Sequence, residues 1–433
     1  MNGLPLELID SVFWWLDGVS LAKSRKVCRQ WRELHQQPNY KSLWKEICFK
    51  EIDKDIIREL TGCCNSHSVY ELRSQITQKD KLKNDVDALN YEVDWELVYK
   101  QWYRSRHIGK WPSLTTELKG HNGPIWDVKL SGDRVVTCGA DATIRIWDGW
   151  TGQCLRILTG HLRGVLCIDL RKRPGVSPSS EKPHDLIVSG SQDNSISIWD
   201  MDKGVCLLSL FGHTHCVNSV SVQEGIIISG ADETSAKVWD FEQDSPDITF
   251  SLSGHDDWVK SVSLWDNRIF SATDNGLMSL WSLDNGELLA SVRISTGGKG
   301  IAGAVLRGDT ALVLSCSGRI TAWTGSEASA DAAVLRSFSI VGQGSSGIQQ
   351  GECIALRGPL VAIGTLYGTV FVYKLKSDWD KEFQEIHTVV RSGKCRVNAV
   401  DMGDDGEGPV LVTAGDDGIA RIHRWFPHCA AEP

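Results

Sequence analysis

The stretch DLIVSGSQDNSISIWD at residues 185–200 decides the fold, together with the Gly160-His161 pair that precedes it. It contains short apolar segments with the alternation of β-strands, separated by turn residues around Asp193. Gly-His pairs also recur at residues 120–121, 212–213 and 254–255. Because the same features return at a period of roughly 40–50 residues, the sequence predicts an array of repeated β units.

Seven such units can be counted between residues 112 and 427. Three end in Trp-Asp, at residues 147–148, 199–200 and 239–240. Four have degenerate endings, at Trp281-Ser282, Trp323-Thr324, Tyr373-Lys374 and His423-Arg424. The pattern resembles a WD-repeat β-propeller, and we expect seven blades, with six or eight as alternatives.

This resemblance implies a hydrogen-bonded series in each complete unit, formed by a histidine, a serine or threonine, an aspartate and a tryptophan. Unit one supplies His121, Thr137, Asp141 and Trp147; unit two supplies His161, Ser189, Asp193 and Trp199. Glu233 and Asn275 stand in the aspartate place of units three and four. The segment Leu114–Leu118 precedes the first Gly-His pair and has no unit of its own. We expect it to close the ring as the outer strand of blade seven, because a closed ring hides its strand edges.

The first fifty residues carry a second pattern. Leu4-Pro5-Leu6-Glu7-Leu8 is followed by Val27-Cys28-Arg29-Gln30-Trp31, and apolar residues recur at helical spacing. The pattern resembles an F-box, a helical module that docks on a Skp-type adaptor. The alternative is a helical hairpin that packs on the rest of the chain. The resemblance implies eight adaptor-binding residues: Leu4, Pro5, Leu8, Leu16, Leu21, Val27, Cys28 and Trp31.

Residues 51–111 are predicted to be a helical linker, with Trp95, Leu97, Val98 and Trp102 on its apolar face. The predicted organisation is therefore an all-α F-box at 1–50, a helical linker at 51–111 and a seven-bladed propeller at 112–427. The fold class is mainly β.

The net charge and the cysteine pattern limit the classes of partner that we expect. The net charge of −9 gives no global basic field, so we expect neither nucleic acid nor a membrane as partner. The 13 cysteines show no zinc-ligand spacing, and we interpret them as reduced. Together with the absence of a signal-like N-terminus, they indicate the cytoplasm, the nucleus or both.

No pattern in the sequence indicates catalysis. Residues 298–303 match Gly-x-Gly-x-x-Gly, but no helix is expected to follow, so a dinucleotide site is not predicted. The four Gly-His histidines occupy equivalent repeat positions, which a structural role explains better than catalysis. We therefore expect a non-enzyme with no cofactor and no metal.

Propellers that resemble this one bind ligands on the face with the Gly-His loops, through three places in each blade. These lie three and five residues after the histidine and just before the turn aspartate. Eleven substrate-binding residues follow: Trp126, Gln192, Asn218, Asp232, Trp258, Lys260, Asp274, Glu352, Arg396, Asn398 and Asp416. The alternative for Trp126 and Trp258 is a place in the core. The set holds four acidic residues, two basic residues and two tryptophans, which predicts a mixed or basic substrate motif.

Together the two resemblances imply the substrate receptor of a Skp–cullin–F-box ubiquitin ligase. The F-box would reach the cullin–RING ligase through the adaptor, and the propeller would bind an unknown protein substrate. The alternatives are a non-degradative scaffold and, least favoured, a propeller enzyme.

Overall fold

The computed structural model describes residues 18–24, 38–61, 93–106, 108, 113–171, 185–223, 225–241, 247–298, 300–308, 310–324, 334–339, 350–374, 384–391, 395–404 and 408–425. The chain divides into two compact units, residues 1–107 and 108–433. The finer division of the first unit at residue 50 stays a prediction.

The described part of the first unit is helical. Its helices are α2 (Gly18–Ser24), α4 (Pro38–Glu51), α5 (Lys54–Thr61) and α7 (Trp95–Ser105). Asp94 caps α7, because its carboxylate accepts a hydrogen bond from the Leu97 amide at 3.1 Å.

Helices α4 and α7 share one apolar core. Trp44 and Tyr99 pack with ring centroids 5.5 Å apart, and the Tyr99 hydroxyl donates to the Glu51 carboxylate at 2.8 Å. Val98 and Trp102 are buried, as the predicted apolar face requires. Leu97 was assigned to that face wrongly: it is 39% exposed, because at 3.6 residues per turn it is rotated by roughly 100° from Val98 and roughly 140° from Trp102 around the helix.

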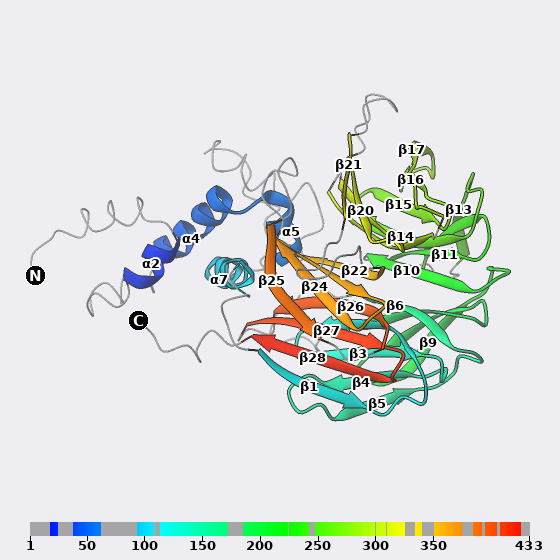
Figure 1. Ribbon diagram of the computed structural model, residues 1–433, viewed down its shortest axis with the longest axis horizontal. Coiled ribbons are helices and arrows are strands. Elements are labelled where there is room, and N and C mark those ends of the chain that lie inside the picture. The colour runs from blue at the N-terminus through cyan, green and yellow to red at the C-terminus, as the bar shows by residue number, and fades with distance from the viewer. Residues whose placement is uncertain are drawn as a thin grey trace, which may run out of the picture. The chain divides into compact units, whose positions relative to one another are not determined.

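The second unit is a ring of seven four-stranded antiparallel sheets, which confirms the predicted propeller (Figure 1). From the innermost strand outward, blades one to three are β2 (Ile125–Ser131), β3 (Arg134–Gly139), β4 (Ile144–Asp148) and β5 (Cys154–Leu158); β6 (Val165–Arg171), β7 (Leu186–Ser191), β8 (Ile196–Asp200) and β9 (Val205–Leu210); β10 (Val217–Gln223), β11 (Ile226–Ala231), β12 (Ser235–Asp240) and β13 (Asp247–Ser253).

Blades four to six follow in the same order. They are β14 (Val259–Trp265), β15 (Arg268–Thr273), β16 (Leu277–Ser282) and β17 (Leu288–Arg293); β18 (Ile301–Arg307), β19 (Thr310–Ser315), β20 (Arg319–Thr324) and β21 (Val334–Ser339); β22 (Gly351–Arg357), β23 (Leu360–Thr365), β24 (Thr369–Lys374) and β25 (Gln384–Arg391).

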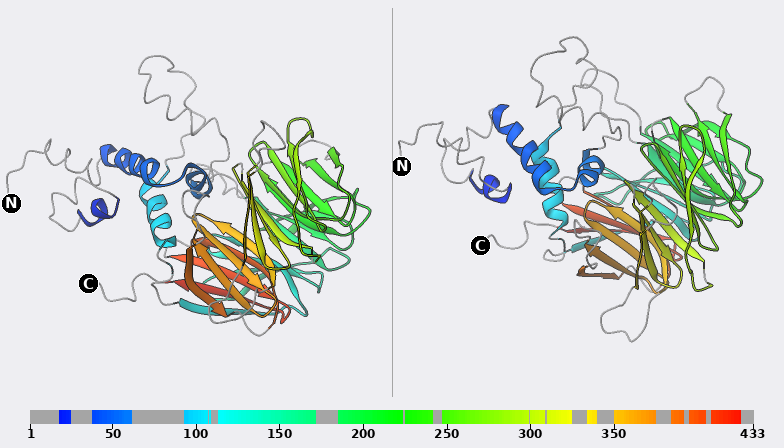
Figure 2. Two further views of the ribbon diagram at one scale, coloured as in Figure 1. Left: turned by 45° about the horizontal axis from the view of Figure 1, so that its top comes forward. Right: turned by 90° about the horizontal axis from the view of Figure 1, so that it is seen from above.

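Blade seven is built from both ends of the unit. Strands β26 (Val397–Asp404), β27 (Pro409–Gly415) and β28 (Ile419–Trp425) are completed by β1 (Ser113–Lys119). Strand β1 pairs antiparallel with β28 from Ser113↔Trp425 to Lys119↔Ile419. The prediction that residues 114–118 close the ring is therefore confirmed (Figure 2).

Side chains on the inner strands join neighbouring blades. Asp401 of blade seven accepts from the Leu130 amide of blade one at 2.7 Å, and Asp127 of blade one accepts from the Ile168 amide of blade two at 2.9 Å. Burial raises the pKa of Asp127 to about 6, although nearby Lys129 favours the charged carboxylate. These links hold adjacent blades in register across their interfaces.

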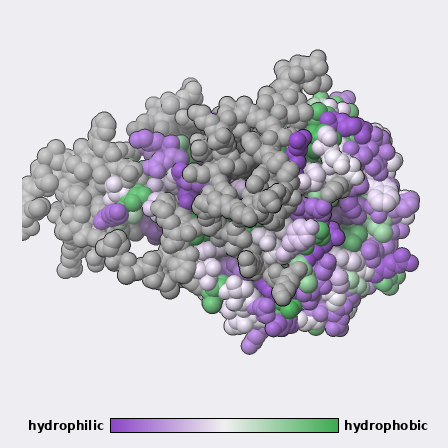
Figure 3. All heavy atoms as spheres, in the orientation of Figure 1, coloured by the Kyte–Doolittle hydropathy of each residue, from purple (hydrophilic) through white to green (hydrophobic). Residues whose placement is uncertain are grey.

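The described surface mixes residue types. In Figure 3 hydrophobic residues lie scattered among hydrophilic ones on the visible part of the second unit. None of the described helices is long and apolar enough to cross a bilayer.

Candidate functional site

One backbone hydrogen bond recurs in all seven blades, at the N-terminal end of each inner strand, and the seven bonds form a ring of equivalent positions. In each blade, the residue just before the turn aspartate place donates its N–H to the carbonyl of the residue just before the inner strand. The seven donor–acceptor pairs are Ala140–Pro124, Gln192–Gly164, Asp232–Cys216, Asp274–Trp258, Cys316–Gly300, Leu366–Gln350 and Asp416–Arg396. Equivalent positions can therefore be assigned in all seven blades, including the degenerate ones.

Each inner strand also carries a β-bulge at its second residue, where the register shifts by one. The seven bulge residues are Trp126, Leu166, Asn218, Lys260, Ala302, Glu352 and Asn398. A bulge leaves one residue outside the ladder and redirects its side chain. The predicted contact position five residues after the Gly-His histidine is this bulge residue. Its side chain therefore does not follow the regular in–out alternation of the strand.

The eleven predicted substrate residues fall on this ring of equivalent places. The sequence assignment omitted ten further ring positions: Pro124, Ala140, Gly164, Leu166, Cys216, Gly300, Ala302, Cys316, Gln350 and Leu366. In blades one to three, the spacing from the Gly-His histidine could have found them. Blades five and six lack that histidine, so no comparable signal marks their positions.

Two predicted asparagines bridge neighbouring blades. Asn218 donates to the Asp232 carboxylate at 2.7 Å and to the Val259 carbonyl of the next blade at 3.2 Å. Asn398 likewise donates to Asp416 at 2.8 Å and to the Ile125 carbonyl at 2.9 Å. Both amides are therefore engaged, and their two carboxylate partners are positioned at the ring.

A third bridge is ionic. The Arg396 guanidinium lies 2.5 Å from the Glu352 carboxylate of the preceding blade. Burial raises the pKa of Glu352, and Arg396 opposes this rise. With Arg396 paired in this way, Lys260 is the one basic residue of the eleven without an ion pair among the described residues.

The two predicted tryptophans differ in exposure. Trp258 is 51% exposed, so its ring is available at the surface and the core alternative does not apply to it. Trp126 is half-buried, and its ring reaches Gly164 of blade two. A Cβ atom added to Gly164 would lie 2.4 Å from the Trp126 ring and 3.2 Å from Gln192 Oε1. Trp126 and Gln192 therefore meet at Gly164, where only glycine leaves enough room.

Asp274 lies beside the Gly-x-Gly-x-x-Gly stretch. Its carboxylate occupies the space next to Gly300, where a Cβ would lie 2.5 Å from Oδ1. Strand β18 begins at Ile301, so no helix follows these glycines and a dinucleotide site is not formed. Burial raises the pKa of nearby Cys316, with Glu352 and Asp274 adding to the rise.

The predicted hydrogen-bonded series are present in blades one to three. In blade two, His161 Nε2 and Trp199 Nε1 both lie 2.8 Å from Ser189 Oγ, and His161 Nδ1 lies 3.1 Å from Asp193. Despite partial burial, hydrogen bonds from Ser195 and the Leu162 amide lower the pKa of Asp193 to about 2. In blade three, Glu233 takes the aspartate place, 2.8 Å from His213 Nδ1.

The series is shorter in blades four and five. His255 and Trp281 both bond Ser271 in blade four. Asn275 occupies the aspartate place, as predicted, but its amide donates to Asp256 at 3.0 Å, and no hydrogen bond joins it to His255 among the described residues. In blade five, Val313 takes the position of Ser189, because Val313 pairs with Thr321 across the sheet in the way that Ser189 pairs with Ser197 in blade two. The serine place therefore has no hydroxyl, and Trp323 Nε1 is left without a hydrogen-bond partner.

Of the eight predicted adaptor-binding residues, only Leu21 lies within the described residues. It is fully buried and belongs to the apolar core with Leu43 and Trp44, so it packs inside the unit. The other seven (Leu4, Pro5, Leu8, Leu16, Val27, Cys28 and Trp31) lie outside the described residues, and their role stays a prediction.

Comparison with known families identifies both patterns. An F-box-like domain matches residues 1–50, and the WD domain, G-beta repeat, matches residues 112–148, 152–200 and 204–240.

Several curated proteins are similar over part of the chain. WD repeat-containing protein pop1 of Schizosaccharomyces pombe is 29% identical over 242 residues, which is 46% of this chain and 31% of that protein. Cell division control protein 4 of Saccharomyces cerevisiae is 25% identical over 52% of this chain and 26% of its own length. F-box/WD repeat-containing protein 7 of Drosophila melanogaster is 30% identical over 37% of this chain and 11% of its own length. The matched region thus spans less than a third of each of these relatives.

Proposed function

The chain joins an F-box-like segment to WD repeats, and on this premise we propose that it is the substrate-recognition subunit of a Skp–cullin–F-box ubiquitin ligase. The F-box-like segment binds a Skp-type adaptor, and through it the cullin–RING ligase. The propeller binds a protein substrate for ubiquitination and degradation. The single observation that carries the proposal is the presence of both modules in one chain, with the propeller ring closed by its own β1 strand.

The substrate binds on the face with the Gly-His loops in this proposal. The ring of equivalent positions supports it, since it presents Trp258 with a half-exposed ring beside polar side chains at repeated places. Tryptophan is enriched at positions that dominate binding energy.

We propose that the recognised motif is mixed or basic, and compatible with aromatic stacking. A multiply phosphorylated motif needs several arginines at the contact face. Among the eleven predicted positions Arg396 already pairs with Glu352, while Asp232, Asp274 and Asp416 add negative charge that repels phosphate. Trp258 offers a face for a cation–π contact with a substrate arginine or lysine.

The direct test is co-purification of the adaptor with the double variant Leu4→Ala, Pro5→Ala. Apolar side chains contribute about 1.5–3 kcal/mol each when fully buried at an interface. The double variant should therefore lose the adaptor, while thermal unfolding of its propeller stays unchanged. Undiminished co-purification would contradict the F-box assignment.

A further inference from the structure

A cavity of about 260 Å³ lies between blades one and two, away from the Gly-His loops. Arg134, Ile146, Leu155 and Arg156 line it from blade one, and Met201 and Asp202 line it from blade two. Arg134 begins β3, directly after the turn that ends β2, and Asp202 lies in the turn after β8. Because the Gly-His loops precede the inner strands, these turns lie at the opposite ends of the strands. The cavity therefore belongs to a different surface from the predicted substrate face.

The equivalent place is filled with apolar side chains at the next two blade junctions. The equivalence follows from strand register, since Ile146↔Arg156 in blade one corresponds to Ile198↔Leu208 in blade two and Val238↔Phe250 in blade three. Likewise, the amides of Met201, Phe241 and Leu283 each bond the carbonyl that precedes the second strand of their own blade.

At those junctions the side chains belong to continuous apolar clusters. One holds Leu186, Ile198, Leu208 and Phe241, and the next holds Ile226, Val238, Phe250 and Leu283. The corresponding set at the first junction is Arg134, Ile146, Arg156 and Met201. Two arginines thus replace apolar residues, and the smaller Met201 stands where the next junction has Phe241. This difference leaves a cavity that is lined by the apolar side chains of Ile146 and Met201 and by the charged side chains of Arg134 and Arg156.

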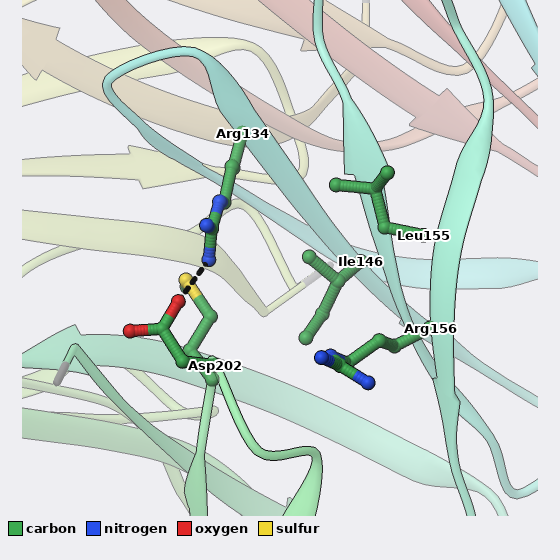
Figure 4. Close-up of a pocket in the computed structure, with 6 residues that line it drawn as sticks. Arg134, Ile146, Leu155, Arg156 and Asp202 are labelled. Carbon is green, nitrogen blue, oxygen red and sulfur yellow. Dashed lines mark hydrogen bonds and ion pairs between the residues drawn. The ribbon is translucent and has the colours of Figure 1, made fainter.

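The two arginines are in different states. Arg134 Nη1 lies 2.6 Å from the Asp202 carboxylate. Arg156 makes no ion pair with any described residue; its stem passes Gly204, where a Cβ would lie 3.0 Å from Arg156 Cδ. Figure 4 shows the Arg134 and Arg156 guanidinium groups on opposite sides of the Ile146 side chain. Within the part of the chain that the structure describes, the cavity therefore offers one guanidinium without an ion pair, beside the apolar side chains of Ile146 and Met201.

The surroundings favour a peptide as occupant. Strand β5 is the outermost strand of blade one, so its outer edge pairs with no described strand and can accept an extended segment. Leu155 and Ile157 on this strand are 48% and 51% exposed. A volume of about 260 Å³ is below the roughly 300–1,000 Å³ of small-molecule sites, and it suits one or two side chains.

We propose that this groove, lined by the six cavity residues and the edge of β5, binds an extended segment of a partner protein in which an apolar side chain lies next to a carboxylate. The apolar side chain enters the cavity over Ile146 and Met201, and the carboxylate pairs with Arg156. This site is additional to the proposed substrate face, and it does not depend on the ubiquitin-ligase proposal.

The test starts with a phage-displayed library of random dodecamers selected on the full chain. Enriched peptides are synthesised with fluorescein, and their affinities are measured by fluorescence polarisation for wild type and Arg156→Leu. This substitution places the residue of blade two at the equivalent site, so thermal stability should be retained or raised. Arg156→Gln is measured alongside, because it removes the charge while keeping a polar side chain. Lys203→Glu is the control, since it changes a charge at a neighbouring site where Lys203 pairs with Asp200 outside the cavity.

We expect peptides with Leu or Met adjacent to Asp or Glu, whose affinity falls at least tenfold in both Arg156 variants and stays unchanged in Lys203→Glu. Enriched peptides that bind all variants equally, or that lose affinity on Arg156→Leu without containing a carboxylate, would overturn the proposal. A library that yields no binder sensitive to Arg156 would overturn it as well.

Discussion

His423 makes the closure of the propeller ring sensitive to acid. It stands in the tryptophan place of blade seven, where it is buried, and its Nδ1 lies 2.9 Å from the Thr115 hydroxyl of the closing strand β1. Burial, and secondarily Arg421, lower the pKa of His423 from 6.5 to about 4. The folded protein therefore holds this imidazole neutral at pH values where the unfolded chain would protonate it.

The sign and size of the effect follow from this shift. The pKa of His423 is lower in the folded protein than in the unfolded chain, so protons bind the unfolded chain more tightly. The free energy of unfolding therefore has its full value above pH 6.5 and falls progressively as the pH drops from 6.5 to about 4. Each pH unit in that window corresponds to about 1.36 kcal/mol, so between pH 6.5 and 5 the loss is about 2 kcal/mol. His423→Gln removes the titration and keeps a neutral polar group next to Thr115.

The assay is urea unfolding of the full chain, followed by tryptophan fluorescence at pH 7 and pH 5. The fall in unfolding free energy on acidification should be smaller by about 2 kcal/mol in His423→Gln than in wild type. His215→Gln is measured as the control, because it makes the same substitution at an exposed histidine. An equal fall in His423→Gln and wild type would refute the reasoning.

Three further outcomes test the blades and the substrate face. Ser189→Ala removes the oxygen shared by His161 and Trp199, and it should lower the free energy of unfolding by about 2–4 kcal/mol, since buried polar groups without partners cost about 1–3 kcal/mol each. A loss below about 0.5 kcal/mol in denaturant unfolding would count against the role of Ser189 as the shared partner. Trp258→Ala should weaken binding of a captured substrate in a pull-down while the thermal midpoint stays unchanged, because its ring is 51% exposed; a large drop in stability with no specific binding loss would place the ring in a structural role. Phosphatase treatment of a captured substrate should leave its affinity for the full chain within tenfold, and a greater loss would show that an arginine cluster binds phosphate.

The repeat pattern predicted the propeller because its signals are local. Gly-His pairs and Trp-Asp endings set the period, and the unassigned segment 114–118 had to pair with the last blade to close the ring. The series around Ser189 and the replacement of aspartate by Glu233 were also predictable, since each depends on spacing inside one unit.

Features that depend on contacts between blades could not be predicted in this way. The cavity beside Arg156 exists because Met201 stands where another junction has Phe241, and that comparison needs the strand register. Asn275 shows a limit inside one blade: it occupies the aspartate place, but its amide donates to Asp256, the neighbour of His255 in the sequence. Leu97 shows the limit of apolar composition alone, since its place on the helix turned it away from the core.

The central claim is that one chain links a substrate on the propeller to degradation through the F-box-like segment. The measurement that tests it most directly is proximity labelling in cells by the full chain and by its Leu4→Ala, Pro5→Ala variant, each with and without a proteasome inhibitor. The account predicts that the wild-type chain labels a Skp-type adaptor and a cullin, that the variant does not, and that the inhibitor raises the abundance of at least one protein labelled by both. Labelled proteins whose abundance is the same with and without the inhibitor would contradict the degradative role and favour a scaffold.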